Sequence, residues 1–481
     1  MNWRTAFFGT CFLAFNLSLG AFASRAQEEP IPVPDAPPQP MPDAPPKSAG
    51  HAFPGIAIGQ QEGELQPDFS PLTGMQNATL GYPEIRHSYW VPGLQFSSNV
   101  QSNAYNQSGG SNWYANNYFI GNLSLLEAWT RATLAVNYSG GGYVSTDSKQ
   151  GNGFYQQLAL TQNFQTERWL FQIIDQFSYI PQSSFGFGGG TNLGIPGVGG
   201  SLGTTIPGLG GNYIPNQSIY GVGAFYNNVA ALPATYALSR RGSVTISGSY
   251  GIMNFVEASN SDSNATVGSI GYNYGLSRND TVGLVYRFSA YHFPGSPQAY
   301  GSNVISVAYG RKVTGHLAFR LFVGPEVTSY RIPVGTASSR TGVSTTANLT
   351  YGFQRAGLAF SYLHGFSGGS GVLVGSILDQ ATATASRNLT RVWTGNLNFG
   401  YAHNSSVAGT IQIGRPVYSS WFVGGGVSRP IGRNFNFAAA YSASTGQYSQ
   451  SGCTGLGCNS TNTYNTVTVN FQWHPRPFVL P

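Results

Sequence analysis

Apolar and polar residues alternate with a period of two along much of this chain. In residues 464–474 the alternation is strict, with four apolar positions set against four polar ones: Val467, Val469, Phe471 and Trp473 against Thr466, Thr468, Asn470 and Gln472. Such a pattern gives a β-strand one apolar face and one polar face. The run is about ten residues long, the length that a tilted strand needs to cross a membrane. We interpret it as the last strand of a closed membrane barrel, paired with the first.

Strands of the same kind recur in pairs that are joined by short polar turns. Residues 242–252, 341–354 and 391–401 alternate in this way, with Ser, Thr, Asn and Gln on the polar face. The clearest turns lie at residues 240–242, 277–280, 312–315, 354–355, 388–391 and 430–433. Longer loops rich in Gly, Ser and Asn separate the pairs, so short turns gather at one end and long loops at the other. The pattern predicts an all-β fold, a transmembrane antiparallel up-and-down β-barrel of about 18 strands, or about 16 as the alternative, because such barrels usually have an even number.

The composition favours a barrel that faces lipid over a soluble fold. Charged residues make up only 8% of the chain, against roughly 25% in soluble domains. Aromatic residues reach 14%, and a disordered chain would lack them. A soluble β-sandwich would also alternate, but its polar faces would normally carry Lys and Glu. The formal net charge of +6 is spread along the chain without a dense basic run, which argues against a nucleic-acid partner.

The amino-terminal region predicts export. Arg4 precedes an apolar core, and Ala21-Phe22-Ala23 is a cleavage site of the signal-peptide type. The next stretch repeats Pro-Asp-Ala-Pro-Pro, which predicts an extended spacer or a docking peptide for a periplasmic partner. The expected organisation is a signal peptide (1–23), a Pro-rich disordered periplasmic tail (24–50), an irregular lead-in or small plug (51–93), the barrel (94–474, its first strand at 94–105) and a carboxyl-terminal tail (475–481).

The longest interruption of the strand pattern runs over residues 181–233. It contains an Ile-Pro-Gly-Val/Leu-Gly-Gly motif twice and is, by strand count, the third loop at the long-loop end. With this arrangement, residues 94–474 resemble a bacterial general porin in architecture. The resemblance implies a third loop that folds into the barrel and narrows the pore, although the acidic residues usual in that loop are missing here; a surface loop is the alternative. The residues expected at the constriction are Phe185, Phe187, Ile195, Ile206 and Leu209.

Few charged residues fall on the predicted lumen faces of the strands. Arg287 shares a face with Thr281 and Ser289, and Arg320 and Glu326 share a face of another strand. These charges are either a selectivity element in the pore or an internal pair that braces the wall. The other positions expected to line the pore are neutral amides: Asn348, Asn396, Asn398, Asn470 and Gln472. Basic residues at the short turns are expected to form a solvated rim at the membrane interface.

Cys453 and Cys458 enclose four residues of the final long loop. Since an exported protein meets an oxidising compartment, they are expected to form a disulfide. The seven histidines are scattered, and the sequence has no Gly-x-Ser-x-Gly, HExxH or Gly-Lys-Ser/Thr motif. The sequence therefore points to no catalytic residues, no metal site and no cofactor, and an enzyme is not expected.

The carboxyl-terminal tail departs from the outer-membrane pattern. The resemblance implies a closing strand that ends in an aromatic residue read by the insertion machinery, a role that Phe471 and Trp473 fit. Residues 475–481 follow, with prolines at 475, 477 and 481. Because proline cannot donate to a strand ladder, we expect this tail to leave the barrel at the short-turn end.

These observations together predict a porin-like channel in the outer membrane of a Gram-negative bacterium. A lumen lined by neutral hydrogen-bonding groups suits passive diffusion of small neutral hydrophilic solutes such as saccharides, because an ion filter would need charged rings. The alternatives are an export barrel for exopolysaccharide and a structural or adhesive barrel with a closed lumen. The expected partners are outer-membrane lipid and lipopolysaccharide, the insertion machinery and a small hydrophilic solute, and a homotrimer is compatible with this architecture.

Overall fold

A computed structural model gives the fold. It describes residues 88–102, 113–146, 151–180, 224–256, 260–294, 298–314, 316–331, 338–352, 356–370, 373–407, 416–450 and 459–480. Contacts divide the chain into two units, Met1–His51 and Ala52–Pro481. All described residues belong to the second unit. The expected signal peptide, Pro-rich tail and most of the lead-in therefore lie outside the described residues.

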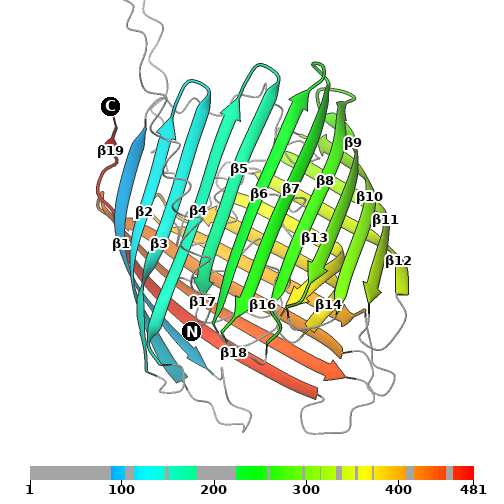
Figure 1. The fold of residues 1–481 in the computed structure, drawn as a ribbon. Helices are drawn as coiled ribbons and strands as arrows, with labels where there is room; N and C mark the ends of the chain where they lie inside the picture. The colour runs from blue at the N-terminus through cyan, green and yellow to red at the C-terminus, as the bar shows by residue number, and fades with distance from the viewer. Residues whose placement is uncertain are drawn as a thin grey trace, which may run out of the picture. The chain divides into compact units, whose positions relative to one another are not determined.

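The described residues form one sheet of antiparallel strands that closes on itself (Figure 1). Each strand pairs with the next in sequence, and β18 pairs with β1 to complete the barrel. The strands are β1 (Tyr89–Ser102), β2 (Trp113–Ala128), β3 (Ala132–Ser145), β4 (Gly153–Gln165), β5 (Trp169–Ile180), β6 (Phe225–Ala237), β7 (Gly242–Phe255), β8 (Ser263–Gly275), β9 (Asp280–His292), β10 (Ala299–Lys312), β11 (Leu317–Arg331), β12 (Ser338–Gly352), β13 (Ala356–Ser370), β14 (Leu373–Asn388), β15 (Thr394–Ser406), β16 (Pro416–Ile431), β17 (Phe435–Gln450) and β18 (Asn459–Trp473). The predicted all-β barrel with eighteen strands is confirmed.

The alternation along each strand sorts side chains to the two sides of the wall. In β18, Phe471 is 47% exposed on the outer face, while its neighbour Gln472 is 2% exposed on the inner face. The same holds in β1, where Leu94 is exposed and Gln95 is buried. Apolar groups outside and polar groups inside reverse the order of a soluble protein, and this is the arrangement of a barrel whose outer surface meets lipid.

Aromatic residues border the apolar outer face at both ends of the strands. At the short-turn end of β5, Trp169 stacks on Phe171 with ring centroids 5.1 Å apart. At the opposite end Tyr179 lies 4.7 Å from Tyr226 of β6. Such girdles mark the two membrane interfaces, so this is an outer-membrane β-barrel. No helix in the described ranges is long and apolar enough to cross a membrane.

A carboxylate lies between these girdles on the outer face. Asp175 is exposed on β5, midway between Phe171 and Tyr179. Asn228 Nδ2 of β6 donates a hydrogen bond to Asp175 Oδ1 at 2.8 Å. An ionisable group at this depth is costly against lipid, and this pair breaks the otherwise apolar surface of β5.

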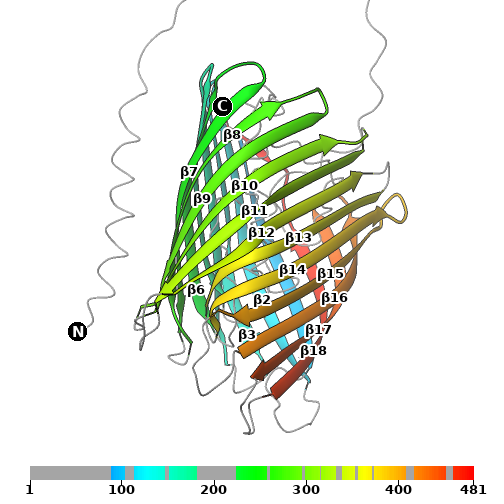
Figure 2. The same cartoon turned by 90° about the vertical axis from the view of Figure 1, so that its right-hand side faces the viewer.

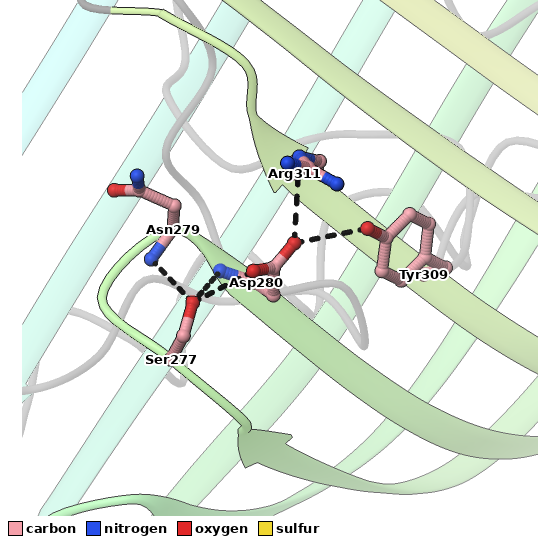
Figure 3. A network of polar contacts seen from close by, with 5 residues as sticks. All are labelled: Ser277, Asn279, Asp280, Tyr309 and Arg311. Carbon is pink, nitrogen blue, oxygen red and sulfur yellow. Dashed lines mark hydrogen bonds and ion pairs between the residues drawn. The ribbon is translucent and has the colours of Figure 1, made fainter.

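Short turns at one end are closed by their own side chains. In the turn before β9, Ser277 Oγ accepts hydrogen bonds from the backbone N–H groups of Asn279 and Asp280 and donates one to Asp280 Oδ2 (Figure 3). Tyr309 donates to Asp280 Oδ1 at 2.9 Å, and Arg311 Nε lies 3.6 Å from the same oxygen. These contacts fasten β9 to β10 at the rim, where polar and charged turn residues were expected.

The carboxyl-terminal tail corrects one prediction. It does not leave the barrel: β19 (Phe478–Val479) pairs with Tyr89 and Trp90 at the start of β1. The ladder of β18 on β1 ends at Trp473, opposite Leu94, so the two prolines after it occupy an interruption and the ladder then resumes. Trp90 also stacks on Phe478 at 4.8 Å. β1 therefore begins at Tyr89, five residues before the expected start of the first strand.

Candidate functional site

Polar side chains without charge dominate the inner face of the wall. Buried Ser, Thr, Asn and Gln recur on it from β1 to β18. The residues predicted to line the pore all lie at inward-facing positions of their strands: Arg287, Arg320, Glu326, Asn348, Asn396, Asn398, Asn470 and Gln472. Asn470 and Gln472 are each 2% exposed and stand opposite Ser97 and Gln95 at the seam between β18 and β1.

At one place β13 separates from its neighbour β12 and bends toward the lumen. β13 pairs with β12 only as far as His364, opposite Thr345, although β12 continues to Ser338. β13 and β14 remain paired to each other up to Ser370 and Leu373. Figure 2 shows the two yellow strands curving at the ends that lie beside the green strands. β14 stays paired with β15 up to Ser376, opposite Ser406, and Gly375 O accepts a hydrogen bond from Val407 N. We call the described residues 365–370 and 373–376 the infolded hairpin.

An aromatic cluster on the inner face of the wall packs against Phe366 of the infolded hairpin. Tyr291 of β9 and Tyr300 of β10 stand opposite each other on the inner face. The ring of Phe366 lies 5.6 Å from each of them. Phe366 is 1% exposed, so its side chain is fully buried against the inner face of strands β9 and β10. Burial of a phenylalanine stabilises this position by about 1.5–3 kcal/mol.

Glycines let the backbone approach these tyrosine rings. A Cβ added at Gly368 would overlap the ring of Tyr291, and one added at Gly375 would overlap the ring of Tyr300. Gly369 and Gly375 also have positive φ angles of 65° and 63°. Glycine takes this conformation at no steric cost, so the glycine-rich sequence of this segment fits its place inside the barrel.

Glu326 of β11 binds the infolded hairpin directly. Its Oε1 accepts a hydrogen bond from Ser302 Oγ at 2.6 Å, and its Oε2 accepts one from the backbone N–H of Phe366 at 2.9 Å. The residue is only 3% exposed. The carboxylate therefore lies on the lumen side of the wall, where the infolded hairpin covers it and binds it.

The two predicted lumen arginines lie at different heights. Arg287 of β9 stands opposite Val304, which in turn stands opposite Glu326, so these three positions share one row across the strands. Arg320 lies six residues closer to the short-turn end of β11 than Glu326 and stands opposite Asn348. The arginines therefore belong to separate levels of the inner face.

Polar side chains fasten the root of the infolded hairpin on the outer face. His364 Nδ1 lies 2.6 Å from Asp379 Oδ1 across β13 and β14, and Tyr362 donates to the same oxygen at 3.1 Å. In the next strands His403 Nδ1 lies 2.8 Å from Ser419 Oγ. Gly365, where β13 turns inward, directly follows His364. These contacts hold the two strands together at the point where the hairpin bends.

Sequence reasoning placed the constriction in a different loop. β6 begins at Phe225, so the interruption after β5 ends earlier than the predicted residue 233. Phe185, Phe187, Ile195, Ile206 and Leu209 lie outside the described residues, as do Cys453 and Cys458, and these predictions stand as they were made. The infolded hairpin was missed. Its signal is the segment after His364, which has four glycines among its first seven residues and a single phenylalanine.

Comparisons with known proteins found similarity to solved structures alone. No protein-family model and no curated protein matches the sequence. Among solved structures, the chain is similar to Pseudomonas aeruginosa OpdQ, with 10% identity, 81% of this chain and 98% of that chain covered and a TM-score of 0.43. It is also similar to P. aeruginosa OccK2 (OpdF), with 8% identity, 80% and 98% covered and a TM-score of 0.42. Acinetobacter baumannii OccAB3 shows 7% identity over 81% and 99%, with a TM-score of 0.38.

Proposed function

We propose that this protein is a passive outer-membrane channel for small neutral hydrophilic solutes, of the size of saccharides. The observation that carries the proposal is the infolded hairpin, which crosses from β13 to the inner face of β8 to β11. An element that narrows a lumen has a use only where something passes through that lumen. The neutral amide and hydroxyl groups of the inner face can exchange hydrogen bonds with uncharged solutes along the way.

The charge distribution favours neutral solutes over ions. A filter for ions uses rings of like charge, whereas Arg287 and Arg320 lie at separate levels and Glu326 is covered by Phe366. The infolded hairpin favours small solutes over an exported polymer, because it occupies part of the lumen. The remaining expected partners, which are lipopolysaccharide, the insertion machinery and further copies of the chain, are part of the same proposal.

Two measurements on the purified, folded protein test the proposal. In planar bilayers, the wild-type protein should give discrete openings, and replacement of residues 366–375 by a short Gly-Ser turn should raise the conductance. In liposome swelling, neutral sugars should enter faster than acidic or basic solutes of equal size. A folded barrel without openings would refute the channel. Faster entry of charged solutes would refute the preference for neutral ones.

A further inference from the structure

At its long-loop end, β12 has an edge beside the infolded hairpin that pairs with no strand of the described residues. β12 is paired with β11 up to Ser338, opposite Tyr330, but its ladder with β13 covers only Thr345 to Gly352. Toward β13, no strand of the described chain pairs with Ser338–Ser344. A free strand edge presents unpaired N–H and C=O groups and is a template for another strand.

Exposure along this part of β12 shows space on both sides of the wall. Ser339, Arg340, Thr341, Gly342 and Val343 are all exposed, so the alternation seen in β1 and β18 is lost. A Cβ added at Gly342, which faces inward, would meet nothing within 4 Å. The edge, the inner face and the outer face are therefore all open at these residues.

The register of β13 fits this edge residue for residue. The last pair is Thr345 with His364. One further step pairs Ser344 with Gly365, the next pairs Val343 with Phe366, and Ser370 would reach Ser339. Strand periodicity then sends Phe366 to the outer face, in line with Leu358 and Phe360. Phe366 would there stand between Val343 and Ile377, its present partner in β14.

We propose that the infolded hairpin is a gate with two docking positions. In the inner position Phe366 and Glu326 hold it against the inner face of β9 to β11. In the wall position it extends the β12–β13 ladder along Ser338–Ser344, together with the end of β15 that stays paired with β14, and clears the lumen. Gly368 and Gly375 allow both positions. They leave room for the rings of Tyr291 and Tyr300 in the inner position and add no side chain in the wall position. The effect on conduction rests on the proposed channel function, whereas the movement itself does not.

Reversible cross-linking tests the wall position. In a background with Cys453 and Cys458 replaced by serine, the variant Val343→Cys/Phe366→Cys places cysteines directly opposite each other in the extended register. Such cross-strand neighbours lie within disulfide distance. In the inner position Phe366 and Val343 lie on opposite sides of the wall. Oxidation of the folded protein should give the disulfide, detected by mass spectrometry of the linked peptides, and conductance should rise and return when the bond is reduced.

Matched variants keep the test decisive. Val327→Cys/Phe366→Cys uses the same outer face one strand farther away and should not cross-link. Ser339→Cys/Ser370→Cys, a later pair of the extended register with the same strand parity, repeats the test with Phe366 and Gly368 intact. Tyr291→Cys/Gly368→Cys should lock the hairpin inside and hold conductance at its low level.

Each outcome bears on a separate part of the proposal. If neither wall pair forms a cross-link in a folded barrel, the proposed movement is refuted and the channel proposal still stands. Equal cross-linking of the Val327 control also overturns it, since the barrel would then be loose throughout. A cross-link without a change in conductance overturns the gate. A cross-link in a barrel that never conducts supports the movement and refutes the proposed channel.

Discussion

Removal of the Glu326 side chain should release the infolded hairpin. Two hydrogen bonds reach this carboxylate, but the bond from Ser302 lies within the wall and only the bond from the Phe366 N–H depends on docking. A hydrogen bond to a charged group contributes about 1.5–3 kcal/mol. Since about 1.4 kcal/mol is a factor of ten, Glu326→Ala should shift the ratio of docked to released hairpin by roughly 10- to 100-fold.

Glu326→Gln is the matched control for this prediction. Glutamine keeps an oxygen that can accept from the Phe366 N–H and an amide that can donate to Ser302 Oγ. Both variants remove the same negative charge from the inner face, but only alanine removes the contact. A change in conductance caused by charge alone would therefore be equal in the two variants, whereas a change caused by release should be large in Glu326→Ala and small in Glu326→Gln.

The assay combines hydrogen exchange with single-channel recording. Exchange of the backbone amides in the peptide that contains Phe366 reports release directly, and it should become faster in Glu326→Ala by about the factor given above. Conductance of the same sample should rise or become noisier. If exchange in Glu326→Ala and in Glu326→Gln matches that of the wild type, the carboxylate does not hold the hairpin and the reasoning is refuted.

Three further perturbations follow from the contacts described. Gly375→Val should displace the hairpin, because a side chain there overlaps the ring of Tyr300; an unchanged exchange pattern of the hairpin amides would contradict this. Deletion of residues 475–481 should lower the unfolding temperature, measured as the temperature at which the folded band shifts in gel electrophoresis. The deletion removes β19 and the ring contact of Phe478 with Trp90, and such an aromatic pair contributes about 0.5–1.5 kcal/mol. Asp175→Leu should raise the free energy of unfolding in lipid by less than about 2 kcal/mol, since lipid-facing carboxylates are costly but less so than basic groups. A loss of stability in Asp175→Leu would instead show that the hydrogen bond from Asn228, or a contact outside the barrel, outweighs the cost of the carboxylate in lipid.

The sequence was informative where one rule acted on every residue of a strand. Alternation at Val467 to Gln472 predicted correctly which side chains face out, because lipid on one side and polar groups on the other act on each position in turn. The same rule placed the turns before β7, β9 and β11 correctly. The same rule assigns Glu326 to the inner face, because alternate residues of a strand face the same side.

The sequence could not show which contacts form across the lumen. Glu326 and Phe366 are forty residues apart, and nothing in the local pattern of either strand pairs them. The segment after His364 has the glycine-rich composition of an ordinary loop, because glycine is common in loops. The tail after Trp473 was misjudged for a related reason. Proline forbids a ladder bond only at its own position, so Phe478 and Val479 could still pair with β1.

The seam at β1 fixes the order in which the protein can be completed. Leu480 N donates to Ser88 O, so residues at the two ends of the described barrel meet at the short-turn end. Every other strand pair joins neighbours in sequence, but β1 cannot receive β18 until the last strand has been made. A sheet that assembles strand by strand therefore keeps two open edges until β18 pairs with β1, almost four hundred residues later in the sequence. Because the strand number is even, Ser88 and Leu480 lie on the same side of the membrane.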